Sequence, residues 1–307
     1  MERITTEVKT LSFFKHHKVI TGLLLILSIF LYLNFTKFNS YVKNTDTKDP
    51  HFINELYKSD NRIYNDYLTD KEKKMYDFII KTSNSHITQV EIDLNEFKCA
   101  DYRECGNLID VATDAIFVDH PELMNYAGYS WHYDYKAFTL RIDYSYLLPF
   151  KDIIGILRIE NVISGIKEAT KDMNDKEKII YVYDWMGQHN YYDKTFMFDS
   201  KNQSVYNVFV KGNAVCAGFA KASQLIFSQI GIKSYIVQGV STGEHMWNIV
   251  EYKDKYYYFD STASVSIDES YEEYHYWGLD QSYLNSYNAH HDDWYPTIQA
   301  TNMFKIK

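Results

Sequence analysis

The sequence predicts an α+β protein of two folded lobes that an apolar N-terminal helix anchors in a membrane. One run of almost wholly apolar residues stands near the N-terminus. After this run, helical and strand-like patterns alternate in the first half of the chain. In the second half, the helical patterns come before the strand-like ones. With 307 residues, 46% hydrophobic and 24% charged, the chain has the composition of a folded globular protein. Its formal charge of -9 argues against a general nucleic-acid binder, which needs a basic face.

The apolar run covers residues 19–35 and follows several lysines. As a helix it would extend about 25 Å, the short end of the lengths that span a bilayer. A cleaved signal peptide also has a short apolar region after positive charge, but no cleavage site with two small residues follows the run. We therefore expect an uncleaved signal anchor, with residues 1–18 in the cytoplasm and the rest of the chain outside. If the segment is cleaved instead, the protein is secreted.

Folded structure is expected from residue 69, after a polar tether over residues 36–68. Thr69 and Glu72 have the spacing of a helix capping box and precede a helical pattern. The sequence then predicts, in order, a strand over residues 87–94, a helix capped by Asn107, and one or two strands over residues 131–146. These elements make up a small N-terminal α/β lobe, residues 69–150.

The second lobe, residues 151–307, opens with two helices, the later one capped by Asn174 or Asp175. A further helix follows a polar loop and ends at Gly231, so Cys216 stands at the start of this helix. Strands are expected over residues 235–239, 245–252 and 255–259, the last two joined at Lys253 and Asp254.

The chain has three cysteines, of which Cys99 and Cys105 lie close together in a polar stretch. Outside the cytoplasm such a pair can form a disulfide, which would leave Cys216 as the unpaired thiol; two unconnected thiols are the alternative. A metal site would need further ligands of suitable spacing, and none stand near the pair. Residues 290–293, two histidines and two aspartates, cannot all converge on one ion in regular structure, so we expect a solvated loop there.

Cys216 has the position that a nucleophilic thiol needs. A thiol attacks as the thiolate, which the unpaired amides and the macrodipole at a helix N-terminus stabilise. A neighbouring imidazolium stabilises the thiolate further, and the same amides can hold an oxyanion. By itself, however, a cysteine on an apolar helix is more often part of the core.

His245 and Asp260 lie on the two strands of one predicted hairpin. If the loop between these strands has an even number of residues, positions whose numbers sum to 507 face one another, and Asp260 lies opposite Trp247 on the face that carries His245. The diagonal is then about 7–8 Å between backbones, which side chains can close. An odd loop would put the two side chains on opposite faces. With an even loop, Asp260 can orient the imidazole of His245, which serves Cys216 as base and then as acid.

Three blocks carry a resemblance to a known family. Cys216-Ala217-Gly218-Phe219-Ala220, His245-Met246-Trp247-Asn248 and Tyr258-Phe259-Asp260-Ser261-Thr262 resemble the three blocks of bacterial transglutaminase-like domains. Residues 203–207 resemble the segment before the nucleophile, and residues 119–123 resemble part of the N-terminal lobe of secreted members. Phe219 stands where the family more often has tyrosine, and Ala263 and Ser264 stand where it often has tryptophan and an acidic residue. These departures affect the expected shape of the cleft more than the triad.

The resemblance implies a papain-like core, in which a helix that carries Cys216 packs on an antiparallel sheet. It implies that Cys216, His245 and Asp260 form a catalytic triad. Three further residues would line the site or assist the oxyanion: Trp247, Tyr206 and Gln203.

The activity that the resemblance implies is an enzyme outside the cytoplasm that acts on amide bonds of protein or peptide substrates through a thioester, without a metal or a cofactor. Cross-linking, deamidation and hydrolysis use the same triad, so a cysteine peptidase is an alternative. A second alternative is a surface scaffold or binding module that keeps the fold for protein contacts without catalysis.

Overall fold

The computed structural model describes residues 67–84, 89–93, 95–123, 126–135, 137–144, 150–195, 202–240, 243–265, 288–289 and 302–303. The chain divides into two compact units, residues 1–51 and 52–307, and all described residues belong to the second. The predicted anchor over residues 19–35 and the predicted loop at residues 290–293 lie outside the described residues. Among the helices of the described part, none is long and apolar enough to cross a membrane.

Helix α3, Asp70–Asn84, opens the first lobe with the capping box that the sequence predicts. The backbone amide of Thr69 donates to Glu72 Oε2 over 2.6 Å, and the amide of Glu72 donates to Thr69 Oγ1 over 3.4 Å. Two donors at the helix start are thereby satisfied reciprocally. Met75 and Ile79, one turn apart on the inner face, are fully buried.

Helix α4, Tyr102–Asp119, begins earlier than predicted. The prediction that Asn107 caps this helix is wrong, because Asp101 has an extended backbone and its carboxylate accepts from the amides of Arg103 and Glu104 at 2.9 and 3.0 Å. An aspartate in this geometry satisfies the first-turn amides and leaves Asn107 inside the helix. The structure joins Cys99 to Cys105 in a disulfide, which ties the chain before α4 to its first turn.

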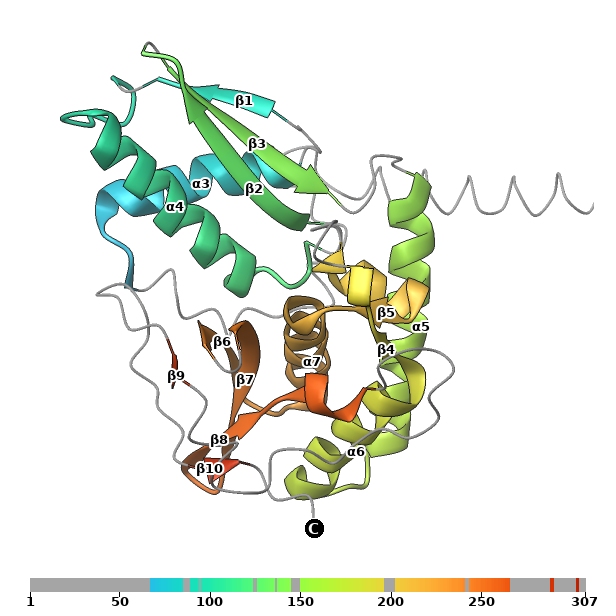
Figure 1. Cartoon of the computed structure of the whole chain (residues 1–307). Helices are drawn as coiled ribbons and strands as arrows, with labels where there is room; N and C mark the ends of the chain where they lie inside the picture. Colours follow the sequence, from blue (N-terminus) through green and yellow to red (C-terminus); the bar gives the residue numbers. More distant parts are fainter. Residues whose placement is uncertain are drawn as a thin grey trace, which may run out of the picture. The chain divides into compact units, whose positions relative to one another are not determined.

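A three-stranded antiparallel sheet completes the first lobe (Figure 1). Its strands are β1, Gln89–Ile92, β2, Tyr126–Tyr133, and β3, Phe138–Tyr144, in the order β1-β3-β2. The predicted strand region thus forms a β2–β3 hairpin that begins at Tyr126. Phe138, Leu140 and Ile142 alternate along β3 and are buried in one core with residues of α3 and α4.

The second lobe is built around helix α7, Cys216–Ile230. Figure 1 shows α7 between the helices α5, Phe150–Thr170, and α6, Asp175–His189, and the strands of the largest sheet. Asn174, one of the two caps that the sequence predicts, starts α6 and forms a capping box with Glu177. Gly231, in the left-handed region at φ 79°, ends α7. Because α7 is covered on both sides, most of its residues are buried, polar ones included.

The largest sheet has the strand order β10-β8-β7-β6-β9. Its members are β6, Ser234–Val240, β7, Glu244–Tyr252, β8, Lys255–Phe259, β9, Asn288–Ala289, and β10, Asn302–Met303. Neighbours pair antiparallel, except that β10 runs parallel to β8. With α7 packed on this sheet, the described part has the α+β architecture that the sequence predicts.

The turn between β7 and β8 decides the geometry of the site. Lys253 and Asp254 form a two-residue turn with φ of 51° and 58°, the left-handed values that tight hairpin turns require. Tyr252 pairs with Lys255 and Asn248 with Phe259, and both pairs sum to 507. The predicted even register is therefore confirmed.

Four short elements frame the start of α7. Strand β4, Tyr191–Tyr192, pairs in parallel with β5, Asn213–Ala214, and a π-helical segment, η4, covers Asn207–Lys211. A 3₁₀ turn, η5, Ser261–Ser264, follows β8. These elements bring the residues on both sides of Cys216 close to the β7–β8 hairpin.

Candidate active site

Cys216 is the first residue of α7 and is half-buried. Val215 before it is extended, with φ of -112° and ψ of 179°, and no side chain caps the helix start. The first-turn amides at this end have no intrahelical partner, so they are directed at the space where a charge on sulfur or on a reacting oxygen would develop. The structure thus gives Cys216 the setting that the sequence predicts.

The β7–β8 hairpin brings His245 and Asp260 together. His245 Nε2 and Asp260 Oδ2 are 2.8 Å apart, and the two side chains are 15% and 1% exposed. The other carboxylate oxygen of Asp260 accepts from the amide of Thr262 over 2.9 Å, which caps η5. Because Nε2 is engaged by Asp260, Nδ1 is the ring nitrogen left for Cys216.

The surroundings of His245 favour the charged form of its imidazole. Burial of His245 opposes its charged form, but the charge and hydrogen bond of Asp260, together with the interaction with Cys216, outweigh burial and raise the pKa of His245 to about 10. An imidazolium held beside a thiol stabilises the thiolate. The arrangement therefore keeps a charged imidazole beside Cys216 near neutral pH.

Two buried hydrogen bonds hold the hairpin on α7. The side-chain amide of Asn248, on β7, donates to the Ala220 carbonyl over 3.0 Å. The hydroxyls of Ser223, on α7, and Ser261, beside Asp260, are 2.9 Å apart. Both partners on α7 lie within two turns of Cys216, so these bonds fix how the His245–Asp260 pair faces the nucleophile.

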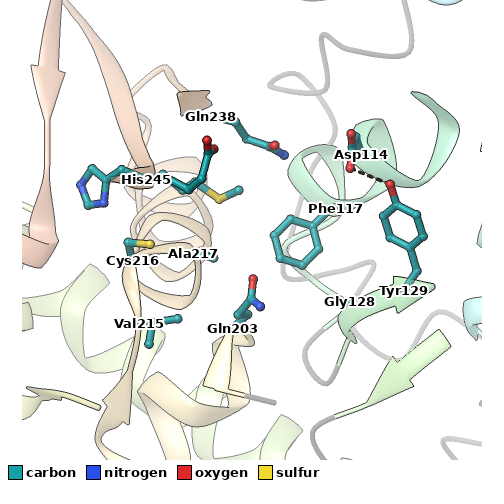
Figure 2. A pocket seen from close by; sticks show the side chains of 12 residues that line it. Asp114, Phe117, Gly128, Tyr129, Gln203, Val215, Cys216, Ala217, Gln238 and His245 are labelled. Atoms are coloured by element: carbon teal, nitrogen blue, oxygen red, sulfur yellow. Dashed lines mark hydrogen bonds between the residues drawn. The ribbon is translucent and has the colours of Figure 1, made fainter. Parts of the chain in front are cut away.

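Cys216 and His245 line a cavity of about 400 Å³ between the two lobes. Figure 2 shows them on one side and residues of α4 and β2 on the other. The first lobe contributes Asp114, Phe117, Gly128 and Tyr129. Sequence reasoning missed this wall, because Asp114 is one of several aspartates in α4, whose second half is largely apolar, and the pattern does not distinguish it.

Gln203 lies in the same cavity, where the resemblance places an oxyanion donor. The amide of Val215 donates to the Asn202 carbonyl over 3.2 Å, which joins the Gln203 segment to the residue before the nucleophile. Gly218 allows this contact, since a Cβ there would meet the carbonyl oxygens of Asn202 and Ser204 at 3.2 and 3.3 Å. The close packing places Gln203 beside the start of α7 (Figure 2).

A buried polar network anchors the Gln203 segment from behind. Asp193 Oδ2 accepts from the side-chain amides of Asn202 at 2.6 Å and Asn213 at 3.0 Å. Its Oδ1 accepts from the amide and hydroxyl of Thr195 at 2.8 and 2.6 Å. Asn207 donates in turn to Asn202 Oδ1 over 3.0 Å. One carboxylate thus connects three segments that precede Cys216 in the chain, those of Thr195, Asn202 and Asn213.

Two of the predicted site residues, Trp247 and Tyr206, do not line the cavity. Trp247 is 1% exposed and does not line the cavity; its ring stacks on that of His245 with centroids 5.9 Å apart and an interplanar angle of 22°. Residues two apart on β7 share a face, and on this face Trp247 is buried with Ile249 in the core that also holds residues of the first lobe. Tyr206 is 6% exposed and lies in the second core, away from the cavity lining. The expectation that Trp247 lines the cleft is therefore corrected, since Trp247 stacks on the histidine from the core. Tyr206, which the resemblance offered as an aid to the oxyanion, is buried in the second core.

Tyr192 is a neighbour of the site that sequence reasoning did not single out. Burial raises its pKa, and the nearby charges of Cys216 and Asp260 add to this effect. A phenol with a raised pKa stays protonated and can donate a hydrogen bond. Its position on β4, paired with the segment before Cys216, explains its proximity.

Within the described residues, no group of three or more histidine, cysteine, aspartate or glutamate side chains is arranged to hold a metal ion.

Comparison of the chain with known proteins agrees with this geometry. Residues 164–261 match the model of the transglutaminase-like superfamily, a range that includes Cys216, His245 and Asp260. No curated protein matches the chain significantly.

Several solved structures are similar at low identity. A transglutaminase crystal structure is 16% identical with a TM-score of 0.33, over 59% of this chain and 52% of that one. A proposed cysteine protease from Cytophaga hutchinsonii is 14% identical with a TM-score of 0.30, over 45% of this chain and 63% of that one. The periplasmic domain of TgpA from Pseudomonas aeruginosa, bound to ethylmercury, is 13% identical with a TM-score of 0.27, over 42% of this chain and 57% of that one.

The chain thus spans about half the length of the first of these proteins, and superpositions this loose support no statement about activity. The family match rests on the sequence of residues 164–261, which carries the helix with Cys216 and the hairpin with His245 and Asp260. Residues 164–261 of the chain therefore form a transglutaminase-like domain.

Proposed function

We propose that this protein is a cysteine enzyme of the acyl-transfer type, acting outside the cytoplasm on amide bonds of protein or peptide substrates. The observation that carries the proposal is the 2.8 Å contact between His245 and Asp260 at the uncapped start of the helix that bears Cys216. The chain supplies the nucleophile Cys216, the base His245 and the orienting carboxylate Asp260 in this sequence order. Each is positioned by a different element of the fold.

Acylation begins when the Cys216 thiolate attacks the carbonyl carbon of an amide. A C–S bond forms, and the carbonyl electron pair moves to oxygen, where the first-turn amides of α7 and the side chain of Gln203 can donate hydrogen bonds. Collapse of this intermediate breaks the C–N bond. His245 gives its proton to the departing nitrogen, so ammonia or an amine leaves and a thioester remains.

The thioester is resolved by a second nucleophile. His245, now neutral, takes a proton from water or from an amine as it attacks the thioester carbon, and the C–S bond breaks to return the Cys216 thiolate. Water yields a carboxylic acid, which is deamidation or hydrolysis, and an amine yields a new amide, which is cross-linking. A cysteine peptidase differs from a transglutaminase here only in the leaving group and the acceptor.

The proposed location rests on two features of the chain. The apolar run over residues 19–35 follows positive charge, which favours a single-pass anchor with its N-terminus inside. The Cys99–Cys105 disulfide of the first lobe belongs to an oxidising compartment. A reporter that works only outside the cytoplasm, fused at the C-terminus, should be active. Activity of a cytoplasm-only reporter at the same position would contradict the proposed topology.

Alkylation of Cys216 by iodoacetamide at pH 7 tests the catalytic proposal. Wild type should react well above the rate of an ordinary thiol, and His245→Ala should lower the rate towards that of a free cysteine. Ammonia release from glutamine peptides, with and without a primary amine, then separates the three outcomes, with Cys216→Ala as the blank. A Cys216 that reacts like an ordinary thiol, with or without His245, would favour the scaffold alternative instead.

A further inference from the structure

The cavity at Cys216 has a wall that belongs to the other lobe. Asp114 and Phe117 come from α4, and Gly128 and Tyr129 come from β2. In Figure 2 their side of the cavity lies across from Cys216. A substrate bound at the nucleophile therefore has part of its length against the first lobe.

Apart from the His245 imidazolium, the charged groups that line this cavity are acidic. Asp114 and Glu244 line it, and no lysine or arginine does so among the described residues. Glu244 directly precedes His245 on β7, whereas Asp114 lies on the opposite wall. His245 is the one lining group whose positive charge the proposed reaction uses. The rest of the cavity thus favours a cation over an anion by charge complementarity.

Asp114 is held in place by its own lobe. The Tyr129 hydroxyl donates to Asp114 Oδ1 at 3.2 Å and lies 3.3 Å from Asp110 Oδ1, which also accepts from the Trp131 indole over 2.7 Å. Burial raises the pKa of Tyr129, and the charges of the two aspartates add to this effect. The phenol therefore stays neutral and keeps Asp114 oriented as an acceptor.

The aromatic rings beside Asp114 suit the same kind of group. Phe117 and Tyr129 line the cavity, and aromatic faces attract ammonium and guanidinium ions. The Phe117 ring already contacts one amino group outside the cavity, since Lys221 Nζ lies 3.1 Å from its centroid. Lys221 itself is buried outside the cavity lining, and burial lowers its pKa, so it does not neutralise the wall.

We propose that Asp114, Phe117 and Tyr129 form a subsite for a lysine or arginine side chain of the substrate, next to the amide that reacts. This inference rests on the proposed function, since it names the substrate class of the same site. The group bound there is recognised and does not react: a carboxylate stabilises an ammonium ion in its charged form, which has no lone pair for attack on a thioester. The preferred acyl donors are accordingly basic peptides.

Binding to Cys216→Ala protein tests the subsite without turnover. The probes are two fluorescein-labelled glutamine pentapeptides that are identical except for lysine or norleucine beside the glutamine. Fluorescence anisotropy should show the lysine peptide binding about tenfold more tightly at low salt, a ratio that falls as salt is raised. Asp114→Asn, made in the same background, should bring the ratio close to one.

Asp110→Asn is the matched control, because Asp110 contacts the same tyrosine but does not line the cavity. It should keep the lysine preference. Equal affinity for the two peptides, or a preference that survives Asp114→Asn, would overturn the subsite. Failure of the proposed function is a separate result. It is measured by the rate at which iodoacetamide alkylates Cys216, and this rate does not depend on the affinity for either peptide.

Discussion

Asp193 accepts a 2.6 Å hydrogen bond from the side chain of Asn202, whose backbone carbonyl in turn accepts from the residue before Cys216. The carboxylate is 8% exposed and binds groups on three segments. A charged acceptor with this many donors is costly to replace, because each donor left behind is buried without a partner. The relationship makes Asp193 a positioning residue for the Gln203 segment and the start of α7.

Asp193→Asn should therefore lower both stability and reactivity. The new amide nitrogen would face the side-chain amides of Asn202 and Asn213, two donors that need an acceptor. We expect a loss of about 2 kcal/mol in the free energy of unfolding, measured by urea, and a slower alkylation of Cys216 in the protein that stays folded. Thr195→Val removes one donor to the other oxygen and is the milder control. An unchanged alkylation rate in folded Asp193→Asn would leave Asp193 with a structural role only.

Gln203→Ala should slow acylation with little effect on stability. Its side chain lines the cavity beside Cys216, and loss of one oxyanion donor lowers kcat by roughly 100-fold or more in enzymes of this type. The measurement is ammonia release under saturating peptide, so that kcat and KM separate. Gln238→Ala, at another position in the lining, controls for a general change of the cavity. A fall in affinity with kcat preserved would argue that Gln203 binds substrate only.

The pH dependence of stability follows from His245. Its folded-state pKa of about 10 lies above the ordinary value near 6.5 that it has in the unfolded chain. A raised folded pKa means that the stabilisation is complete below about pH 6.5 and is lost as the pH rises towards about 10. Urea unfolding at pH 6, 8 and 10 should show the advantage of wild type over Asp260→Asn shrinking along this series. An advantage that grows with pH would mean that the histidine is held neutral.

Gly218→Ala should destabilise the protein, whereas Gly165→Ala should not. A Cβ on Gly218 would lie 2.8 Å from the Ala214 Cβ and close to two backbone carbonyls, so α7 and the Gln203 segment would have to separate. Overpacking of this kind costs about 1–3 kcal/mol. Gly165, inside α5, has nothing within 4 Å of a new Cβ, and alanine is the better helix former by roughly 1 kcal/mol. Thermal unfolding of the two variants should shift in opposite directions.

Removal of the Cys99–Cys105 disulfide should loosen the first lobe. The bridge closes a short loop, with a sequence separation of 6, so the chain-entropy model gives a stabilisation of about 2 kcal/mol. The double variant Cys99→Ser, Cys105→Ser should unfold at lower urea than wild type, and a reductant should have no further effect on it. Equal stability of oxidised and reduced wild type would show that the bridge contributes nothing to the fold.

The nucleophile and the hairpin pair were predictable because local rules determine both. A two-residue turn at Lys253 and Asp254 sets the register of the strands, and the register sets which side chains share a face. The start of α7 follows from a helical pattern that ends at a glycine. Neither inference needs knowledge of distant parts of the chain.

The opposite wall of the cavity was not predictable in this way. Asp114 and Tyr129 reach the site because the two lobes pack together, and about 100 residues of sequence separate Asp114 from Cys216. The position of Trp247 was missed for a related reason: a tryptophan two residues from the histidine can face the cleft or the core, and only its packing in the core shared with the first lobe decides. At Asn107, two side chains compete to cap one helix, and the aspartate that comes earlier in the chain is the one whose backbone is extended.

The disulfide in the first lobe also changes what a thiol measurement counts. Of the three cysteines, two are joined to each other and Cys216 is the one free thiol. In protein kept from reductants, a colorimetric thiol titration therefore yields the concentration of intact nucleophiles directly. Each preparation can be assigned a number of active centres before any substrate is known.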